Sequence, residues 1–245
     1  MNLAKIRVVG IGPGDYREMT LRAVDALNAC DVIVGYHVYV DLVKDHFPGK
    51  EFHTTPMRRE VDRCNIALEL ARQGRDVAMI CSGDAGVYGM AGLIYELRGE
   101  AGDVEVEVVG GLTAAISGGA RLGAPLTHDF CVISLSDLLT PWETIEKRLE
   151  CAALGDFAVA LYNPASMKRR DYLQKACDIL LRHARPETVC GVVKNIGREG
   201  EEIRVMTLAE LRDYQADMFT TAFIGNSHTK VIDGRMVTPR GYRDV

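Results

Sequence analysis

Short apolar runs alternate along the chain with turns of small residues and with stretches of helical spacing. Runs rich in β-branched residues predict strands at 6–9, 32–34, 77–80, 104–109, 130–135, 157–162, 188–193, 203–206 and 221–224, with extended pieces at 53–56 and around residue 234. Amphipathic patterns predict helices at 20–29, 38–47, 58–73, about 87–94, 115–121, 141–153, 167–183 and 208–214. This alternation of strands and helices is typical of an α/β fold.

The helix expected at 141–153 carries start signals of its own. Thr140 is a candidate N-cap, Pro141 suits the first helical position, and Glu143 is placed to complete a capping box. We therefore predict that side-chain hydrogen bonds fix the beginning of this helix.

The stretch 76–92, DVAMICSGDAGVYGMAG, combines an apolar run with a turn of small residues and the start of a helical pattern. A turn of this kind lies at the carboxyl end of a strand, where open α/β sheets bind ligands. Asp84 is the one acidic residue between Ile80 and Ile94, and no Lys or Arg occurs there. A phosphate-binding loop normally adds a cation. The composition therefore indicates a ligand that is neutral or positively charged.

Two further glycine-rich turns follow predicted strands. The first, 10–15, reads GIGPGD and departs from the GxGxxG spacing of dinucleotide-binding proteins, and Pro13 removes an amide that would face a pyrophosphate. The second, 110–115, reads GGLTAA and contains no Lys or Arg. Neither turn has the GK[ST] sequence of a P-loop. For the first turn a purely structural role stays open beside a ligand-binding one.

Composition and charge exclude several classes of function. The 245 residues are 47% hydrophobic and carry a net charge of −5, with a pI near 5.7, so no overall positive field attracts nucleic acid or an anionic membrane. No apolar run approaches the length needed to span a bilayer, and no secretory leader is evident. We expect a cytoplasmic protein without nucleic-acid or membrane partners.

Seven cysteines are spread along the chain without a CxxC pair, so neither a metal site nor a disulfide framework is predicted. Reduced thiols in or near the core are the simpler interpretation. The stretch 123–127, GAPLT, reads as a connector, which predicts two domains, 1–123 and 124–245.

The ordered motifs resemble those of a known family. GIGPGD at 10–15, SGDAGVYGMAG at 82–92, GLTAA at 111–115 and the Tyr-Asn-Pro turn at 162–164 are similar to the motifs of the class III, tetrapyrrole-type S-adenosylmethionine methyltransferases. HDFCVISLSDLLTPWE at 128–143, together with GNS at 225–227 and the tail GRMVTPRGY, resembles the precorrin-3B C17-methyltransferase branch. The resemblance covers essentially the whole chain.

The resemblance implies two α/β domains with a cofactor cleft between them, the tetrapyrrole methylase fold, and a homodimer. It implies S-adenosylmethionine as cofactor, whose positive sulfur agrees with loops that lack cations. Carried over motif by motif, the cofactor-binding residues are Pro13, Gly83, Asp84, Val87, Tyr88, Thr113, Ala114, Tyr162, Asn163, Asn195 and Gly225. Asn195 and Gly225 are expected on equivalent strand ends.

The implied reaction is methyl transfer to carbon 17 of a corrin precursor with contraction of the macrocycle, a step of cobalamin synthesis. Methyl transfer requires mainly alignment and exclusion of water, whereas ring contraction benefits from a positioned acid or base. The candidates for that role are Asp15, His128 and Asp137, and an ordinary hydrogen-bonded histidine stays open for His128. The small-molecule substrate carries many carboxylates, which arginines bind well. The expected substrate-binding residues are Arg58, Arg59, Arg63, Ser136 and Arg240.

Alternatives to this function stay open at the level of sequence. Methylation of another tetrapyrrole position, such as carbon 11 or carbon 20, or a reaction like that of diphthine synthase, would keep the cofactor loops and change the substrate face. A protein that senses a nucleotide-like ligand without chemistry is an alternative of another class. The resemblance does not distinguish a metal-free substrate from one that contains cobalt.

Overall fold

The computed structural model describes residues 4–99, 103–166 and 169–242. The chain forms two compact units, residues 1–114 and 115–245, hereafter unit 1 and unit 2. The sequence places the division later, between 123 and 124. In the structure, β6 (Gly123–Ala124) pairs in parallel with β13 (Arg235–Val237), so the stretch expected to be a connector belongs to a small sheet of unit 2.

Unit 1 is built on a parallel sheet of five strands in the order β3-β2-β4-β1-β5. The strands are β1 (Ala4–Gly10), β2 (Val32–Tyr36), β3 (Glu51–Thr55), β4 (Val77–Cys81) and β5 (Val104–Val109). Every neighbouring pair is parallel, so all carboxyl ends lie along one edge. Because β4 is covered on both faces, its five residues are all buried, as the continuous apolar run predicts.

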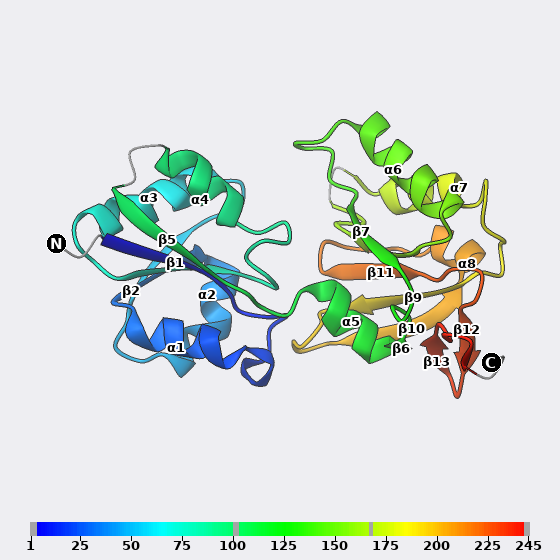
Figure 1. The fold of residues 1–245 in the computed structure, drawn as a ribbon, viewed down its shortest axis with the longest axis horizontal. Coiled ribbons are helices and arrows are strands. Elements are labelled where there is room, and N and C mark those ends of the chain that lie inside the picture. Colours follow the sequence, from blue (N-terminus) through cyan, green and yellow to red (C-terminus); the bar gives the residue numbers. More distant parts are fainter. Residues whose placement is uncertain (1–3, 100–102, 167–168, 243–245) are drawn as a thin grey trace. The chain divides into compact units, whose positions relative to one another are not determined.

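Helices cover both faces of this sheet (Figure 1). The helices are α1 (Leu21–Ala29), α2 (His37–Val43), α3 (Glu60–Arg72) and α4 (Ala91–Arg98), with short 3₁₀ turns η1 (Tyr16–Glu18) and η2 (Lys44–His46). One buried cluster joins α1 and α2 to the sheet and another joins α3 and α4. The helices after β1 and β4 therefore leave toward opposite faces. Such a switch between adjacent strands is where open α/β sheets leave a crevice.

Unit 2 contains a mixed sheet in the order β10-β9-β11-β8-β7. Its strands are β7 (Phe130–Ser134), β8 (Ala158–Tyr162), β9 (Val189–Lys194), β10 (Glu202–Thr207) and β11 (Thr220–Ile224). β7 is parallel to β8, and β11 is antiparallel to both β8 and β9. β7, β8 and β9 consequently point the same way, and β11 points the other way. A second, small sheet joins β12 (Lys230–Ile232), β13 and β6.

The helices of unit 2 are α5 (Ala114–Leu122), α6 (Trp142–Leu154), α7 (Tyr172–Leu180) and α8 (Leu208–Arg212). Residues of α6, α7 and α8 share one apolar core with the large sheet. α5 packs against Phe223 so closely that a Cβ added to Gly118 would lie 2.8 Å from the phenyl ring. Small residues in α5 thus permit the helix to approach the sheet.

The predicted strands are confirmed, and several helix boundaries are wrong. α4 begins only at Ala91 because residues 87–90 belong to the preceding loop. α7 begins at Tyr172, and residues 167–168 of its predicted start lie outside the described residues. The capping box at Thr140 is also wrong, since Pro141 is the N-cap of α6 and makes no side-chain capping bond. Proline has a fixed φ, which favours the start of a helix without a side-chain hydrogen bond.

All seven cysteines are free, and five are buried, as the sequence predicts. Burial raises the pKa of the Cys64 thiol to about 12 and that of Cys81 to about 11, so these thiols stay protonated and unreactive. In the part of the chain that the structure describes, no helix is long and apolar enough to cross a membrane.

Candidate functional site

The loops after β1 and β4 are joined through their backbones. Gly12 and Gly83 exchange two hydrogen bonds: the Gly12 N–H donates to the Gly83 carbonyl at 3.1 Å, and the Gly83 N–H donates to the Gly12 carbonyl at 2.7 Å. Both glycines have φ near +70°, at +73° and +72°. Side chains rarely adopt this conformation, so glycine is required at both positions.

The loop after β5 packs against the same two loops. A Cβ added to Gly111 would lie 2.3 Å from the Gly83 carbonyl oxygen and 2.6 Å from that of Gly10. A Cβ on Gly10 would lie 2.7 Å from the Gly83 oxygen. Three loops from 10–15, 82–86 and 110–113 therefore meet at one place, which we call the carboxyl edge of unit 1. The sequence predicts this convergence from the strand ends, and the structure confirms it.

Asp84 holds two of these loops together. Its Oδ1 accepts hydrogen bonds from the backbone N–H groups of Gly86, at 2.8 Å, and Val87, at 3.1 Å. Its Oδ2 accepts one from the Gly111 N–H at 2.9 Å. Hydrogen bonds to a carboxylate are stronger than those between neutral groups. The one carboxylate of the central loop therefore shapes the edge as well as giving it negative charge.

The first loop is also organised by a carboxylate. Asp15 accepts a hydrogen bond from the Arg17 N–H at 2.8 Å, which caps η1, and pairs with the Arg17 guanidinium at 2.7 Å. Arg17 is 86% exposed, so this ion pair is weakened by solvent. The Asp15 carboxylate thus offsets the positive charge of Arg17, which follows this loop in the chain. Pro13, next to Gly12, is buried.

The other cofactor candidates of unit 1 border the same loops. Val87 receives a bond from Asp84, and Tyr88 follows it with φ at +54° and 54% of its surface exposed. Thr113 and Ala114 lie next to Gly83, because a Cβ built on that glycine would be 3.7 Å and 3.9 Å from their backbone atoms. The structure therefore brings together the unit 1 residues that the resemblance assigns to the cofactor.

The arginines of unit 1 differ in their environment. Arg58 and Arg59 are exposed in the segment between β3 and α3, and Arg59 pairs with Asp62. Arg63 is only 5% exposed, and its guanidinium donates to Thr55 Oγ1 at 2.8 Å and to the Pro56 carbonyl at 3.2 Å. This geometry gives Arg63 a structural role in unit 1 rather than a surface for substrate.

The carboxyl ends of β7, β8 and β9 form the carboxyl edge of unit 2. Tyr162 Oη accepts from the Ala115 N–H at 2.6 Å, and Asn163 Nδ2 donates to Ser134 Oγ at 3.0 Å. Asn163 and Asn195 have φ at +54° and +52°, a conformation that asparagine tolerates better than most residues. Asn195 also donates from Nδ2 to the Gly200 carbonyl at 3.3 Å.

The expectation that Gly225 occupies a strand end equivalent to that of Asn195 is wrong. Gly225 follows β11, which runs antiparallel to β8 and β9, and its N–H donates to the Val189 carbonyl at the start of β9. It therefore lies at the opposite edge of the sheet. There it lines a pocket with Asp156 and His183.

The structure also separates two of the three acid–base candidates. His128 precedes β7 and Asp137 follows it, so they lie at opposite ends of a five-residue strand, which spans about 17 Å. His128 stacks on His228 with ring centroids 6.0 Å apart, and its Nε2 lies 3.1 Å from the Pro239 carbonyl. This arrangement fits the interpretation of His128 as a hydrogen-bonded structural histidine. Arg240, next in the chain after Pro239, is exposed.

Asp137 belongs to a side-chain network that the sequence does not reveal. Its Oδ2 accepts from the Tyr172 hydroxyl at 2.6 Å, and its Oδ1 lies 3.3 Å from Arg169 Nη1. The same Nη1 donates to Ser136 Oγ at 2.6 Å. The Tyr172 hydrogen bond, helped by the Arg169 charge, lowers the pKa of Asp137 below its usual value. Asp137 is therefore ionised at neutral pH and poorly suited to donate a proton.

Arg169 and Tyr172 were missed because the pattern predicts a helix already at 167, where consecutive basic residues look like a solvated first turn. The run of basic residues at 168–170 is the sequence signal that could have pointed to Arg169. Trp142, whose ring centroid lies 4.7 Å from that of Tyr172, packs on the core of unit 2 beside this network. Among residues 4–99, 103–166 and 169–242, no group of three or more His, Cys, Asp or Glu side chains is arranged to hold a metal ion.

Comparison with known proteins places these features in a family context. A family model described as Tetrapyrrole (Corrin/Porphyrin) Methylases matches residues 5–212. A protein of Salmonella typhimurium named probable cobalt-factor III C(17)-methyltransferase is 48% identical over 238 residues, covering 97% of this chain and 99% of that protein. A precorrin-3B C(17)-methyltransferase from a Sinorhizobium species is 40% identical over 245 residues, covering 96% of each. The crystal structure of the methyltransferase CobJ matches with a TM-score of 0.89 at 37% identity, covering 96% of this chain and 100% of that one.

Proposed function

Because the chain belongs to the tetrapyrrole (corrin/porphyrin) methylase family, we propose that it transfers a methyl group from S-adenosylmethionine to carbon 17 of precorrin-3B or its cobalt-containing counterpart. Ring contraction accompanies the transfer, in cobalamin biosynthesis. The observation that carries this proposal is the similarity to relatives named for C17 methylation. In the Salmonella protein this similarity covers 97% of this chain and 99% of the relative. A domain-level similarity alone would not support a position on the macrocycle.

The carboxyl edge of unit 1 fits the cofactor. S-adenosylmethionine supplies a methyl group bound to a positively charged sulfur. The loops at 82–86 and 110–113 carry the Asp84 carboxylate and no Lys or Arg, so their charge favours a cation. Gly10, Gly12 and Gly111 bring backbone groups close together where a side chain would intrude. We assign Pro13, Gly83, Val87, Tyr88, Thr113 and Ala114 to the same role.

In unit 2 we assign Tyr162, Asn163 and Asn195 to the adenosine part of the cofactor. The amide side chains offer both donors and acceptors, and a tyrosine ring offers a stacking surface. Their side chains are held by the hydrogen bonds to Ala115, Ser134 and Gly200 described above. Gly225 is left out of this assignment because it lies at the other edge of the sheet.

The residues of the chain contribute mainly alignment to the methyl transfer. A methyl carbon on a positive sulfur is already activated, so holding the two reactants in line and excluding water gives most of the acceleration. Ring contraction also needs a proton transfer, and we propose that the Asp15 carboxylate, which is paired with Arg17, accepts the proton as a general base. His128 does not fit this role because it lies at the opposite end of β7 from Ser136.

A turnover assay tests the proposed function. The purified protein is incubated with S-adenosylmethionine and, in parallel, with precorrin-3B and its cobalt complex, and the products are examined by mass spectrometry and NMR. We expect the mass of one CH₂ to be added and the new methyl carbon to be attached to carbon 17. Methylation at carbon 11 or carbon 20 would assign a sister activity instead. Tight cofactor binding without turnover on either macrocycle would favour a ligand sensor.

The proposal extends to assembly and location. We propose a homodimer in the cytoplasm, and the support for both points is the family resemblance. Light scattering after gel filtration gives the mass of the assembly in solution, and fractionation of the source cells gives its location.

A further inference from the structure

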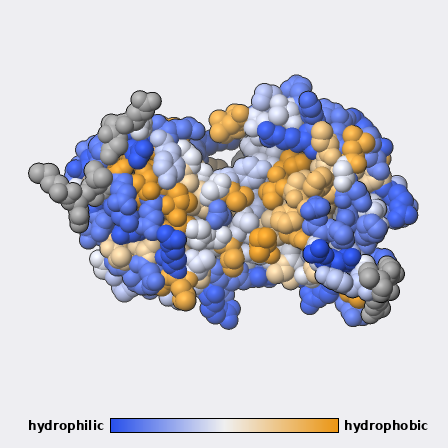
Figure 2. Space-filling model, viewed as in Figure 1, coloured by the Kyte–Doolittle hydropathy of each residue, from blue (hydrophilic) through white to orange (hydrophobic). Residues whose placement is uncertain are grey.

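The loop between β7 and α6 presents two leucines to solvent. Leu138 is 71% exposed and Leu139 is 95% exposed. Figure 2 shows apolar side chains protruding on the segment that leads into α6. Single exposed apolar residues are ordinary, but two adjacent leucines at the tip of a held loop require a reason.

This loop is anchored on both sides of its tip. Before the tip, the Leu135 N–H donates to the Tyr162 carbonyl at 2.9 Å, and Asp137 is bound by Tyr172 and Arg169. After the tip, Trp142 packs on the core of unit 2. The leucines are thus exposed on an anchored loop. Binding of an apolar ligand over them would therefore lose little conformational entropy of the loop.

Arg169 adds a cation beside the leucines. Its Nε donates to Ser166 Oγ at 3.1 Å, and its Nη1 contacts Ser136 and Asp137. These contacts fix the plane of the guanidinium, and none of them uses the N–H donors of Nη2. A guanidinium held in this way binds a carboxylate with little loss of side-chain entropy.

We propose that Leu138, Leu139 and Arg169 form a recognition surface for a carboxylated macrocycle, in which the leucines contact the apolar ring face and Arg169 binds a peripheral carboxylate. Asp137, Ser136 and Tyr172 are positioning residues that hold this surface. The inference deepens the proposed function and rests on it for the identity of the substrate. It differs from the sequence-based assignment in replacing Arg63, which is buried, by Arg169.

The test measures binding and turnover separately. Binding of uroporphyrin, which has free carboxylates, and of its neutral methyl ester is followed by fluorescence. We expect Arg169→Gln to weaken uroporphyrin binding by roughly tenfold and to leave the ester unaffected, since about 1.4 kcal/mol corresponds to a factor of ten. Arg169→Lys keeps the charge without the planar donor geometry and should fall between. The double variant Leu138→Ser with Leu139→Ser should weaken the binding of both uroporphyrin and its ester.

Matched controls are available in unit 2. Arg182→Gln removes a half-exposed arginine that pairs with Glu146 and Glu150, and Leu154→Ser changes a leucine that is 69% exposed. Neither should alter macrocycle binding. For turnover, the Arg169 variants should raise the KM for the macrocycle while the affinity for S-adenosylmethionine stays within twofold.

The outcomes distinguish this inference from the proposed function. Unchanged uroporphyrin binding in Arg169→Gln, or no binding of either porphyrin by the wild type, overturns the inference whatever the turnover assay gives. Macrocycle binding that depends on Arg169, without methylation of precorrin-3B or of its cobalt complex, supports the recognition surface and refutes the C17 activity. A parallel loss of cofactor affinity would show that the variants act through the fold, which also overturns the inference.

Discussion

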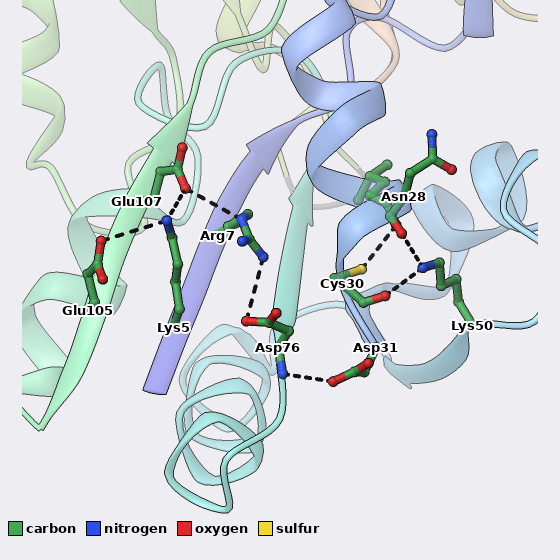
Figure 3. Close-up of polar contacts among 10 residues, drawn as sticks. Lys5, Arg7, Asn28, Cys30, Asp31, Lys50, Asp76, Glu105 and Glu107 are labelled. Carbon is green, nitrogen blue, oxygen red and sulfur yellow. Dashed lines mark hydrogen bonds and ion pairs between the residues drawn. The ribbon is translucent and has the colours of Figure 1, made fainter. Parts of the chain in front are cut away.

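The carboxyl-edge loops of unit 1 and the strands β1 and β5 that lead to them are held by different chemistry. At the carboxyl edge, the loops are joined by backbone hydrogen bonds and by the Asp84 carboxylate. Along β1 and the neighbouring edge strand β5, charged side chains pair instead (Figure 3). Lys5 Nζ lies 2.8 Å from Glu107 Oε2, and Arg7 Nη1 lies 3.8 Å from Asp76 Oδ1. The same sheet therefore carries paired charges along β1 and β5, whereas its loops at 82–86 and 110–113 contain no Lys or Arg.

This difference explains why the carboxyl-edge loops fit a cationic cofactor. The overall composition, with 26% charged residues, would supply cations to any part of the chain. Their scarcity in the carboxyl-edge loops is therefore a local property and not a property of the chain. An edge made of closely packed backbone also has little freedom to adapt, whereas exposed ion pairs are individually weak and replaceable. Substitutions in the carboxyl-edge loops and among the charged pairs should accordingly differ in both size and kind.

The largest effect is expected from Gly111→Ala at the carboxyl edge. The new Cβ would lie 2.3 Å from the Gly83 carbonyl oxygen, so the loops must separate. Overpacking of this kind costs roughly 3 kcal/mol of the free energy of unfolding. Affinity for S-adenosylmethionine should fall by roughly tenfold or more. Chemical denaturation and isothermal titration calorimetry measure the two effects.

Gly92→Ala is the matched control for Gly111→Ala. Gly92 lies in α4, and a Cβ added there meets no atom within 4 Å. Alanine is the better helix former by up to about 1 kcal/mol, so this variant should be slightly stabilised and should bind the cofactor normally. A Gly111→Ala protein with wild-type stability and affinity would contradict the close packing of the three loops.

The next effect is expected from Asp84→Asn. Asparagine can keep the bonds to Gly86 and Val87 through its carbonyl oxygen, but its amide would then face the Gly111 N–H, donor against donor. Leaving a bond of this kind unmade costs about 1–3 kcal/mol. We expect a lower melting temperature and weaker binding of the cofactor. Asp25→Asn, which changes an exposed carboxylate in α1, should do neither.

Two ligands separate the charge of Asp84 from its structural bonds. S-adenosylmethionine carries the positive sulfur, and S-adenosylhomocysteine does not. If the carboxylate attracts that charge, Asp84→Asn should weaken the first ligand more than the second. An equal loss for both ligands would mean that Asp84 acts only through the loop hydrogen bonds.

The central features of the site could be predicted from local sequence. Strands such as β4 are continuous apolar runs, and small residues after them mark turns wherever the strands pair. The Asp84 carboxylate is visible in the loop composition. Its bond to Gly111 is not, because that partner lies 27 positions further on and is fixed only by strand order. Local patterns thus identified the loops without showing what holds them together.

Errors arose where direction or tertiary partners decide the outcome. An apolar run has no direction, so the antiparallel path of β11, which moves Gly225 to the far edge, could not be inferred from residues 221–224. Arg63 looks like the first-turn cation of an amphipathic helix, yet Thr55 on β3 draws it into a buried position. Residues 140–143 match the capping-box pattern, but in the structure Pro141 is the N-cap of α6 and no side chain caps the helix.

A smaller effect, on stability alone, is expected from Glu107→Gln away from the cofactor loops. Hydrogen bonds from Lys5 and Arg22 lower the pKa of Glu107 from 4.5 to about 2. A carboxyl with a depressed folded pKa stabilises the protein above its unfolded value, and this contribution is lost as the pH falls from about 4.5 to about 2. Solvent screening reduces it to about 1 kcal/mol. Denaturation across this pH range measures it.

Glu107→Gln should therefore lower the free energy of unfolding at neutral pH and leave affinity for S-adenosylmethionine unchanged. Below the folded pKa, the variant and the wild type should be equally stable. Loss of cofactor affinity in this variant would break the contrast between the loops and the charged pairs, because it would show that the charges along β1 and β5 influence the carboxyl edge.

The smallest effect is expected from Lys50→Met. Lys50 Nζ donates to the carbonyls of Asn28, at 2.5 Å, and Cys30, at 2.6 Å, at the end of α1 (Figure 3). A cation at a helix C-terminus contributes about 0.3–1 kcal/mol, and the effect is screened by salt. Methionine keeps the apolar stem and removes the charge. The loss in unfolding free energy should therefore shrink as salt is added, and a loss that does not change with salt would assign the contribution of Lys50 to packing instead.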